Sequence, residues 1–109
     1  MFKLNPNPTF VAAVPLSVPG MAEPLEVSFT FRHQNKAALS KWMTDAKGKS
    51  GSENLHKIIA DWVGVFGEDG LQVPYSLTAL TDLLENYSAA EGEIFRAYMQ
   101  ELTEAKRKN

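Results

Sequence analysis

Hydrophobic and polar residues alternate along residues 25–32, in the order Leu-Glu-Val-Ser-Phe-Thr-Phe-Arg. A period of two places the four apolar side chains on one face of a strand and the polar side chains on the other. An apolar run at residues 10–14 precedes this segment, and the Pro19-Gly20 pair between the two is typical of a tight turn. The pattern predicts an N-terminal β-hairpin within residues 1–34, with one face buried.

From Asn35 onward the hydrophobic period becomes helical. Asn35 is expected to cap a first helix that ends near Ala46. The break at residues 48–52 is followed by a predicted second helix, whose apolar positions recur at helical spacing through Phe66. The apolar positions of the first predicted helix are Ala38, Leu39, Trp42, Met43 and Ala46, and those of the second are Leu55, Ile58, Ile59, Trp62, Val63 and Phe66.

Two further helices are expected after the turn at residues 67–70. Ser76 is positioned to cap the third, and the Ser-x-x-Glu spacing at residues 88–91 predicts a capping box that opens the fourth and longest. The predicted inward positions of the fourth helix are Ile94, Phe95, Tyr98, Met99, Leu102 and Ala105.

These elements predict an α+β fold, in which an N-terminal β-hairpin (residues 1–34) packs on a bundle of about four α-helices (residues 35–109). An isolated hairpin is marginally stable in water, so its apolar face needs helices to cover it. A chain of 109 residues is the size of one ordinary domain. We therefore expect a single domain over residues 1–109.

Composition removes several classes of protein. The chain has no Cys, which excludes disulfide frameworks, thiolate metal sites and cysteine nucleophiles. The start of the chain lacks the apolar segment of a secretory signal, and no run approaches the ~20 apolar residues that span a bilayer. A soluble protein of the cytoplasm, without membrane association, is the expectation.

The net charge of −2 hides an uneven distribution. Residues 35–57 carry five Lys against two acids, whereas residues 58–105 carry one Arg against nine acids. Nucleic-acid binding is disfavoured, because such proteins normally present a larger basic face. The asymmetry matters for association with other proteins more than for the fold.

The sequence shows no constellation typical of catalysis. The two histidines, His33 and His56, are not at metal-ligand spacing, and Glu68-Asp69-Gly70 lacks the rest of a calcium loop. No Gly-rich phosphate loop is present. We expect no enzyme, no metal site and no cofactor, and interpret the chain as a protein-binding module.

Several short motifs follow one another along nearly the whole chain. They are Phe-Lys-Leu at residues 2–4, Thr-Phe-Arg-His at 30–33, Asp-Trp-Val-Gly-Val at 61–65, Asp-Gly at 69–70, Val-Pro-Tyr-Ser at 73–76, Leu-Leu-Glu-Asn-Tyr at 83–87 and Ala-Lys-Arg-Lys-Asn at 105–109. Each motif alone is weak, but their order and spacing resemble those of the tail assembly chaperones of long-tailed bacteriophages and prophages.

The resemblance implies a function that composition does not reveal. Members of this family bind the long, largely helical tape-measure protein, keep it soluble and help to recruit tail-tube subunits before they leave the maturing tail. They act in the host cytoplasm and are absent from the mature virion. Many are also made in a longer, frameshifted form.

Two surfaces are predicted to make the contacts. Exposed edges of the second and fourth helices, at Trp62, Phe66 and Tyr98, are expected to bind the client. Oppositely charged helices are expected to join neighbouring copies into a coat, which salt should loosen: Lys36, Lys41 and Lys47 would face Glu85, Glu91 and Glu93. The edge of the hairpin is a second candidate, since an unpaired strand can add a partner strand.

Two alternative functions stay open at this point. One is a structural tail or connector subunit, which should persist in purified virions. The other is a generic adaptor that binds a single unrelated partner.

Overall fold

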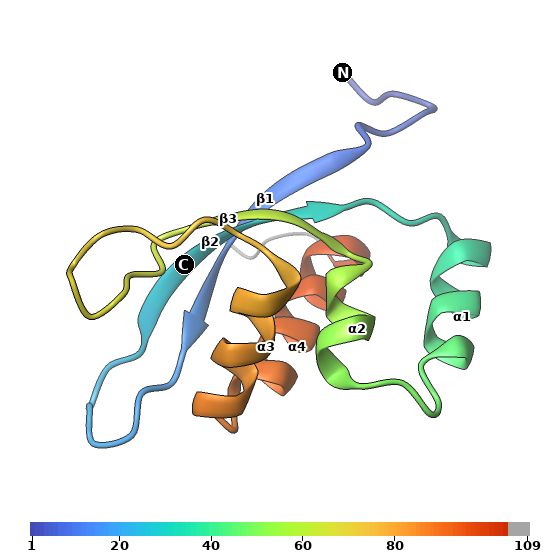
Figure 1. Cartoon of the computed structure of the whole chain (residues 1–109). Helices are drawn as coiled ribbons and strands as arrows, with labels where there is room; N and C mark the ends of the chain where they lie inside the picture. The colour runs from blue at the N-terminus through green and yellow to red at the C-terminus, as the bar shows by residue number, and fades with distance from the viewer. Residues whose placement is uncertain (105–109) are drawn as a thin grey trace.

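The computed structural model describes residues 1–104. Three strands form one antiparallel sheet in the order β1-β2-β3, and four helices of the described residues lie on one side of it (Figure 1). The ending at residues 105–109, including the inward position predicted for Ala105, lies outside the described residues. The elements are β1 (Thr9–Leu16), β2 (Leu25–Arg32), α1 (Lys36–Asp45), α2 (Gly51–His56), β3 (Ile59–Val63), α3 (Leu77–Asn86) and α4 (Ala90–Thr103).

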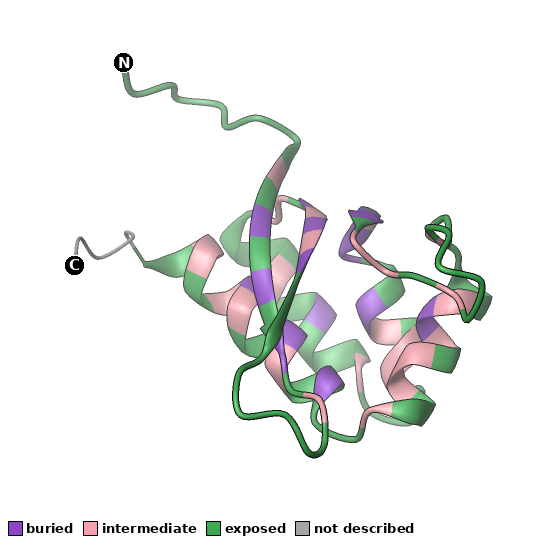
Figure 2. Cartoon of the chain, turned by 90° about the vertical axis from the view of Figure 1, so that its left-hand side faces the viewer, coloured by how far each residue is buried: buried purple, intermediate pink, exposed green. Residues whose placement is uncertain are grey.

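The predicted hairpin is confirmed as β1 and β2. Phe10 pairs with Phe31 and Val14 with Val27, so the apolar residues of both strands share one face. Buried and exposed residues consequently alternate along the strands (Figure 2). Gly20 adopts a positive φ of 86° in the connecting turn, a conformation that glycine takes at little cost.

The predicted second helix is wrong over most of its length. Helix α2 ends at His56, and residues 59–63 form β3, which pairs with β2. A register shift beside Thr30 and Phe31 interrupts this pairing, and both Ile58 and Ile59 are buried there. Two adjacent buried residues, with Leu55 before them and Trp62 after them, reproduce the spacing of a helix face. The molecule is therefore a three-stranded sheet with helices, rather than a hairpin on a bundle.

Two of the three predicted helix caps are confirmed. The side chain of Asn35 accepts a hydrogen bond from the amide of Ala38 (2.8 Å), and that of Ser76 accepts one from the amide of Ala79 (3.0 Å). The capping box at residues 88–91 is wrong, because α4 begins one residue after Ala89, which makes no side-chain cap.

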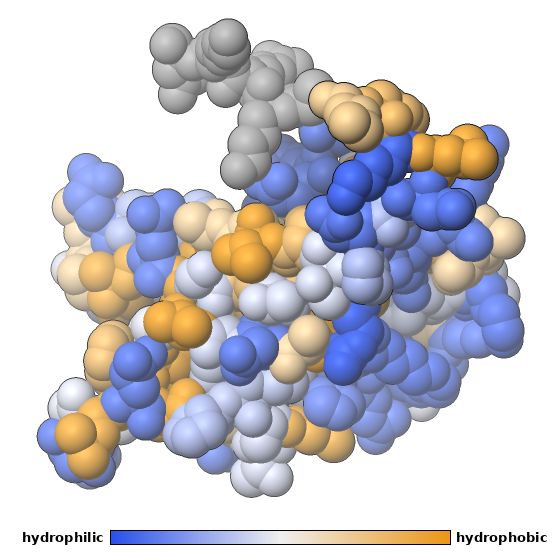
Figure 3. Space-filling model, turned by 90° about the horizontal axis from the view of Figure 1, so that it is seen from above, coloured by the Kyte–Doolittle hydropathy of each residue, from blue (hydrophilic) through white to orange (hydrophobic). Residues whose placement is uncertain are grey.

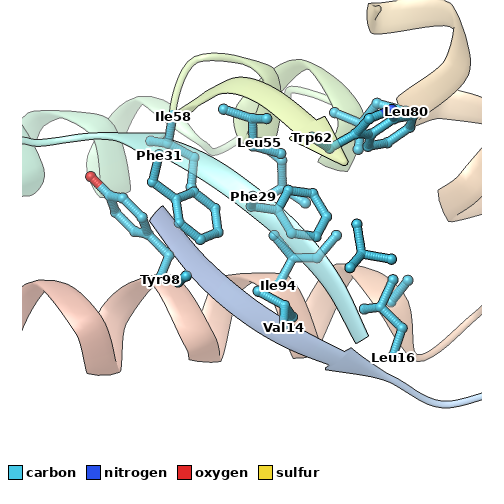
Figure 4. Packing of buried hydrophobic residues seen from close by; sticks show 14 of the residues in the cluster. Val14, Leu16, Phe29, Phe31, Leu55, Ile58, Trp62, Leu80, Ile94 and Tyr98 are labelled. Atoms are coloured by element: carbon cyan, nitrogen blue, oxygen red, sulfur yellow. The ribbon is translucent and has the colours of Figure 1, made fainter. Parts of the chain in front are cut away.

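The core lies between the sheet and α4 (Figure 4). Phe29 and Phe31 of β2 are fully buried, as are Ile94 and Tyr98 of α4. The rings of Phe31 and Tyr98 meet edge to face, with centroids 5.1 Å apart. The Tyr98 hydroxyl donates a hydrogen bond to the carbonyl of Arg32 (2.8 Å), and burial raises the pKa of this phenol to about 12. One helix is thus fixed to the central strand by both packing and a polar contact.

The opposite face of the sheet is not covered by any described helix. Val11 of β1 and Val63 of β3 are 63% and 57% exposed on this face. Seen from above, apolar side chains on this side of the molecule are separated by polar ones (Figure 3). The described residues therefore bury only one side of the sheet.

Candidate functional site

A hollow of about 340 Å³ opens between α1, α2 and α4, and we call it the helical groove. Its walls are mostly apolar, and Glu91 is the one ionisable side chain among the described residues that line it. The lining residues are Trp42, Met43, Ala46, Gly51, Asn54, Leu55, Glu91, Gly92 and Phe95. A hollow with an apolar lining and few polar groups is the usual form of a binding site.

Helix α1 reaches the rest of the molecule mainly through Trp42, the single buried residue of that helix. The Trp42 ring stacks on Phe95 at 5.9 Å and meets Tyr98 edge to face at 5.8 Å. Its indole N–H donates to the carbonyl of Asn54 (3.0 Å), and the side-chain Nδ2 of Asn54 donates to the carbonyl of Ala46 (3.3 Å). These contacts fix one turn of α1, and the helical groove lies beside that turn.

Two apolar side chains remain open to solvent at the helical groove. Met43 is 47% exposed and Phe95 is 37% exposed, although both occupy positions that the sequence predicted to be inward. The prediction treated each helix as packed along its whole apolar face, whereas α1 packs only at Trp42. Apolar residues that stay exposed beside a buried anchor are suited to contact with a partner.

Gly51 leaves room for the side chain of Glu91 between α2 and α4. A side chain at this position would overlap the Glu91 carboxylate, which would have to move away. The absence of a side chain at Gly51 therefore allows the Glu91 carboxylate to lie at the wall of the groove.

Charges of opposite sign lie on the two sides of the groove. Lys36, Lys41 and Lys47 belong to α1 and the segment after it, whereas Glu91 belongs to α4. Lys41 forms an ion pair with Asp45 of its own helix (2.8 Å), which raises the pKa of Lys41 and lowers the pKa of Asp45. The neighbouring Lys49 lowers the pKa of Lys57, the residue that follows α2.

The three aromatic residues predicted at exposed helix edges have different surroundings. Trp62 is 4% exposed and Tyr98 is fully buried, so their predicted exposure is wrong. Trp62 lies on β3, where its indole N–H donates to the carbonyl of Val73 (2.8 Å) and positions the following loop. Phe66 is 60% exposed, but it lies in that loop rather than on a helix.

Two of the charged side chains predicted to pair between copies already have partners within one chain. Lys41 binds Asp45, and the Glu93 carboxylate accepts hydrogen bonds from the amide (3.0 Å) and hydroxyl of Ser17. Lys36, Lys47, Glu85 and Glu91 are exposed. Their pairing with a neighbouring copy stays a prediction.

The histidines do not converge. Nδ1 of His56 lies 2.7 Å from the hydroxyl of Tyr75, whose pKa burial raises to about 12, while His33 follows β2. Within residues 1–104, no group of three or more metal-ligating side chains is placed to hold a metal ion. The helices of that same range are too short or too polar to cross a membrane.

Comparison with known proteins gives one match. A family model described as phage tail assembly chaperone matches residues 1–109, the whole chain. No curated protein and no solved structure matches the chain significantly.

Proposed function

The chain belongs to the phage tail assembly chaperone family, and we propose that it binds the tape-measure protein through the helical groove. In this role it keeps the long client soluble in the host cytoplasm, helps to recruit tail-tube subunits and leaves before the virion is complete. It acts by binding alone, without catalysis or a cofactor.

The observation that supports this proposal is the partly exposed apolar lining of the groove. Met43 on α1 and Phe95 on α4 lie on two sides of it, with Trp42 between them. An amphipathic helix binds such a groove through apolar side chains at i, i+3, i+4 and i+7. A largely helical client offers segments of this kind repeatedly.

The charges beside the groove favour one class of client segment. Glu91 on α4 would attract a basic residue, and Lys36 and Lys47 on the α1 side would attract acidic ones. Exposed charges add mainly to orientation and to the rate of encounter, while apolar contacts supply most of the affinity. The preferred segment is therefore an amphipathic helix with basic and acidic flanks.

The test is co-expression with the tape-measure protein of the same phage. Wild-type chain should keep the client soluble and co-purify with it. Met43→Asp should reduce the amount of co-purified client at least ~10-fold, because the introduced carboxylate must be desolvated in the groove. Phe66→Asp is the matched control, since it places the same charge on an exposed apolar residue outside the groove.

Three results would contradict the proposal. Wild-type chain that neither solubilises nor retains the tape-measure protein would remove the proposed client. Loss of the co-purified client with Phe66→Asp but not with Met43→Asp would place the binding surface in the loop after β3. Stoichiometric recovery of the chain from purified virions would instead indicate a structural tail subunit.

A further inference from the structure

Within residues 1–104, no strand pairs with the outer edge of β1. Strand β1 is first in the order β1-β2-β3, so β2 is its one neighbour among the described strands. It is eight residues long, and its pairing with β2 runs without a register shift. Natural proteins usually protect such edges with charged residues, bulges or a covering element.

The backbone groups that point out of this edge can be identified. The amide of His33 donates to the carbonyl of Pro8 (2.9 Å), which makes these two residues a hydrogen-bonded pair. Since bonding and non-bonding pairs alternate in an antiparallel ladder, Phe10, Ala12 and Val14 also bond to β2. Thr9, Val11 and Ala13 direct their N–H and C=O groups away from β2.

The hydrogen bonding of β2 on its β3 side confirms which residues of β1 point away from β2. Arg32, which pairs with Thr9 across the hairpin, directs its amide to the carbonyl of Ile58 on the β3 side (2.7 Å). Thr9, Val11 and Ala13 are all exposed. The open edge therefore presents three amide donors and three carbonyl acceptors in a regular row.

We propose that this edge pairs with the β1 edge of a second copy, antiparallel and about a two-fold axis at Val11. This register places Val11 opposite Val11 of the other copy, and Thr9 opposite Ala13. These three hydrogen-bonded pairs exchange two bonds each, so every amide and carbonyl of the row is satisfied. An isologous contact of this kind closes into a dimer and leaves no open end of β1.

The composition of β1 fits a second copy as the occupant. Around a two-fold axis like charges would meet, and the segment Thr-Phe-Val-Ala-Ala-Val-Pro-Leu contains no charged residue. Pro15 has no amide to donate, so a register centred on Ala13, which would place Pro15 opposite Val11, loses donors. The sequence of the strand thus permits the pairing and disfavours that shift.

The dimer has a consequence for the geometry of binding. Antiparallel pairing at this edge extends the sheet to six strands and keeps the helices of both copies on the same side. Two helical grooves would then face one client, and linked sites gain affinity without new contacts. The pairing itself does not depend on the proposed function, because it needs no client.

The first test measures the oligomeric state by sedimentation equilibrium up to about 1 mM protein, a range that detects weak association. Wild-type chain should dimerise, and Val11→Lys should raise the dissociation constant at least ~10-fold, because two lysines would meet at the axis. Val63→Lys, on the same face but two strands away, should change it less than ~2-fold. Mixing Val11→Lys with Val11→Glu should restore dimers.

A second test reports the register directly. The chain has no Cys, so Val11→Cys introduces one thiol per copy. Opposite residues of a hydrogen-bonded pair have Cα atoms ~5.5 Å apart, within the range that a disulfide spans. Mild oxidation should cross-link Val11→Cys into a covalent dimer and leave Val63→Cys monomeric.

Three outcomes would overturn the proposal. They are a wild-type chain that stays monomeric throughout the range, a dimer that Val11→Lys and Val63→Lys weaken equally, and a Val11→Cys chain that cross-links no more than Val63→Cys. Co-purification of the tape-measure protein is a separate readout, so failure of the dimer would leave the client proposal standing.

Discussion

Two sides of this small domain are built in opposite ways. Where α4 lies under the sheet, whole side chains such as Phe29, Ile94 and Tyr98 are removed from water. On the α1 side, the indole of Trp42 is the one buried side chain that attaches the helix, and Met43 stays half exposed beside it. The first arrangement gives stability, while the second leaves an apolar surface that only a partner can cover. The comparison indicates that the scaffold and the binding surface share Trp42 and Leu55 but are otherwise built from different residues.

The largest difference between the two sides should appear on truncation of apolar side chains. Phe29→Ala should lower the free energy of unfolding by about 3–5 kcal/mol, since it leaves a cavity in the core. Met43→Ala should lower it by less than about 1 kcal/mol, because this side chain already contacts water. Urea unfolding followed by circular dichroism measures both values. Equal losses would mean that the groove is part of the core.

Truncation of Trp42, which attaches α1, should show a further difference in stability between the α1 side and the α4 side. Trp42→Ala should cost about 3 kcal/mol, the low end of the range for a buried aromatic side chain, and the loss should be concentrated in α1, because Trp42 is the buried residue of that helix. Trp42→Phe keeps ring packing and loses the hydrogen bond to Asn54, so it should cost about 1 kcal/mol. Amide exchange measured residue by residue checks this: α1 should lose protection while α4 keeps it. Uniform loss would contradict the separation.

A smaller loss than for Phe29→Ala or Trp42→Ala is expected at the polar contact of the core. Tyr98→Phe should cost about 1–2 kcal/mol at neutral pH, since the carbonyl of Arg32 loses its donor. Burial raises the pKa of Tyr98 in the folded chain to about 12, above the ordinary tyrosine value of 10.0. The unfolded chain releases that proton first, so this stabilisation is complete below pH 10 and declines as the pH rises towards 12.

Thermal unfolding between pH 9 and pH 12 measures this effect. Tyr98→Phe should reduce the alkaline decline, and the remainder should include Tyr75, whose pKa is raised in the same direction. An unchanged slope in Tyr98→Phe would show that the phenol does not stabilise the folded state in this way.

The hairpin, two of the caps and the α+β class could be predicted from the sequence, because each rests on local signals. Alternation in β2 and the side chains of Asn35 and Ser76 carry those signals within a few residues. Family membership was likewise predicted from the order of motifs, and the match over residues 1–109 confirms it.

The third strand and the groove could not be predicted, because both depend on contacts between distant segments. The pairing of β2 with β3 skips Ala60, so Ile59 and Trp62 share the buried face three residues apart, and Ile58 is buried just before the strand. Local periodicity cannot distinguish this spacing from that of a helix face. The exposure of Met43 depends on how far α1 stands from α4, which only the contacts of Trp42 determine. Tyr98 was correctly predicted to point inward, but its place at an exposed edge was wrong, because Phe10 of β1, Phe31 of β2 and Trp42 of α1 pack around its ring.

The most direct test of the separation between scaffold and binding surface is amide hydrogen exchange of the chain, with and without helical segments of the tape-measure protein. Binding in the groove should slow exchange in α1, in α2 and in the first turns of α4, and should leave β2 and β3 unchanged. Slowed exchange confined to the loop after β3, or none in α1 at saturating client, would contradict the account.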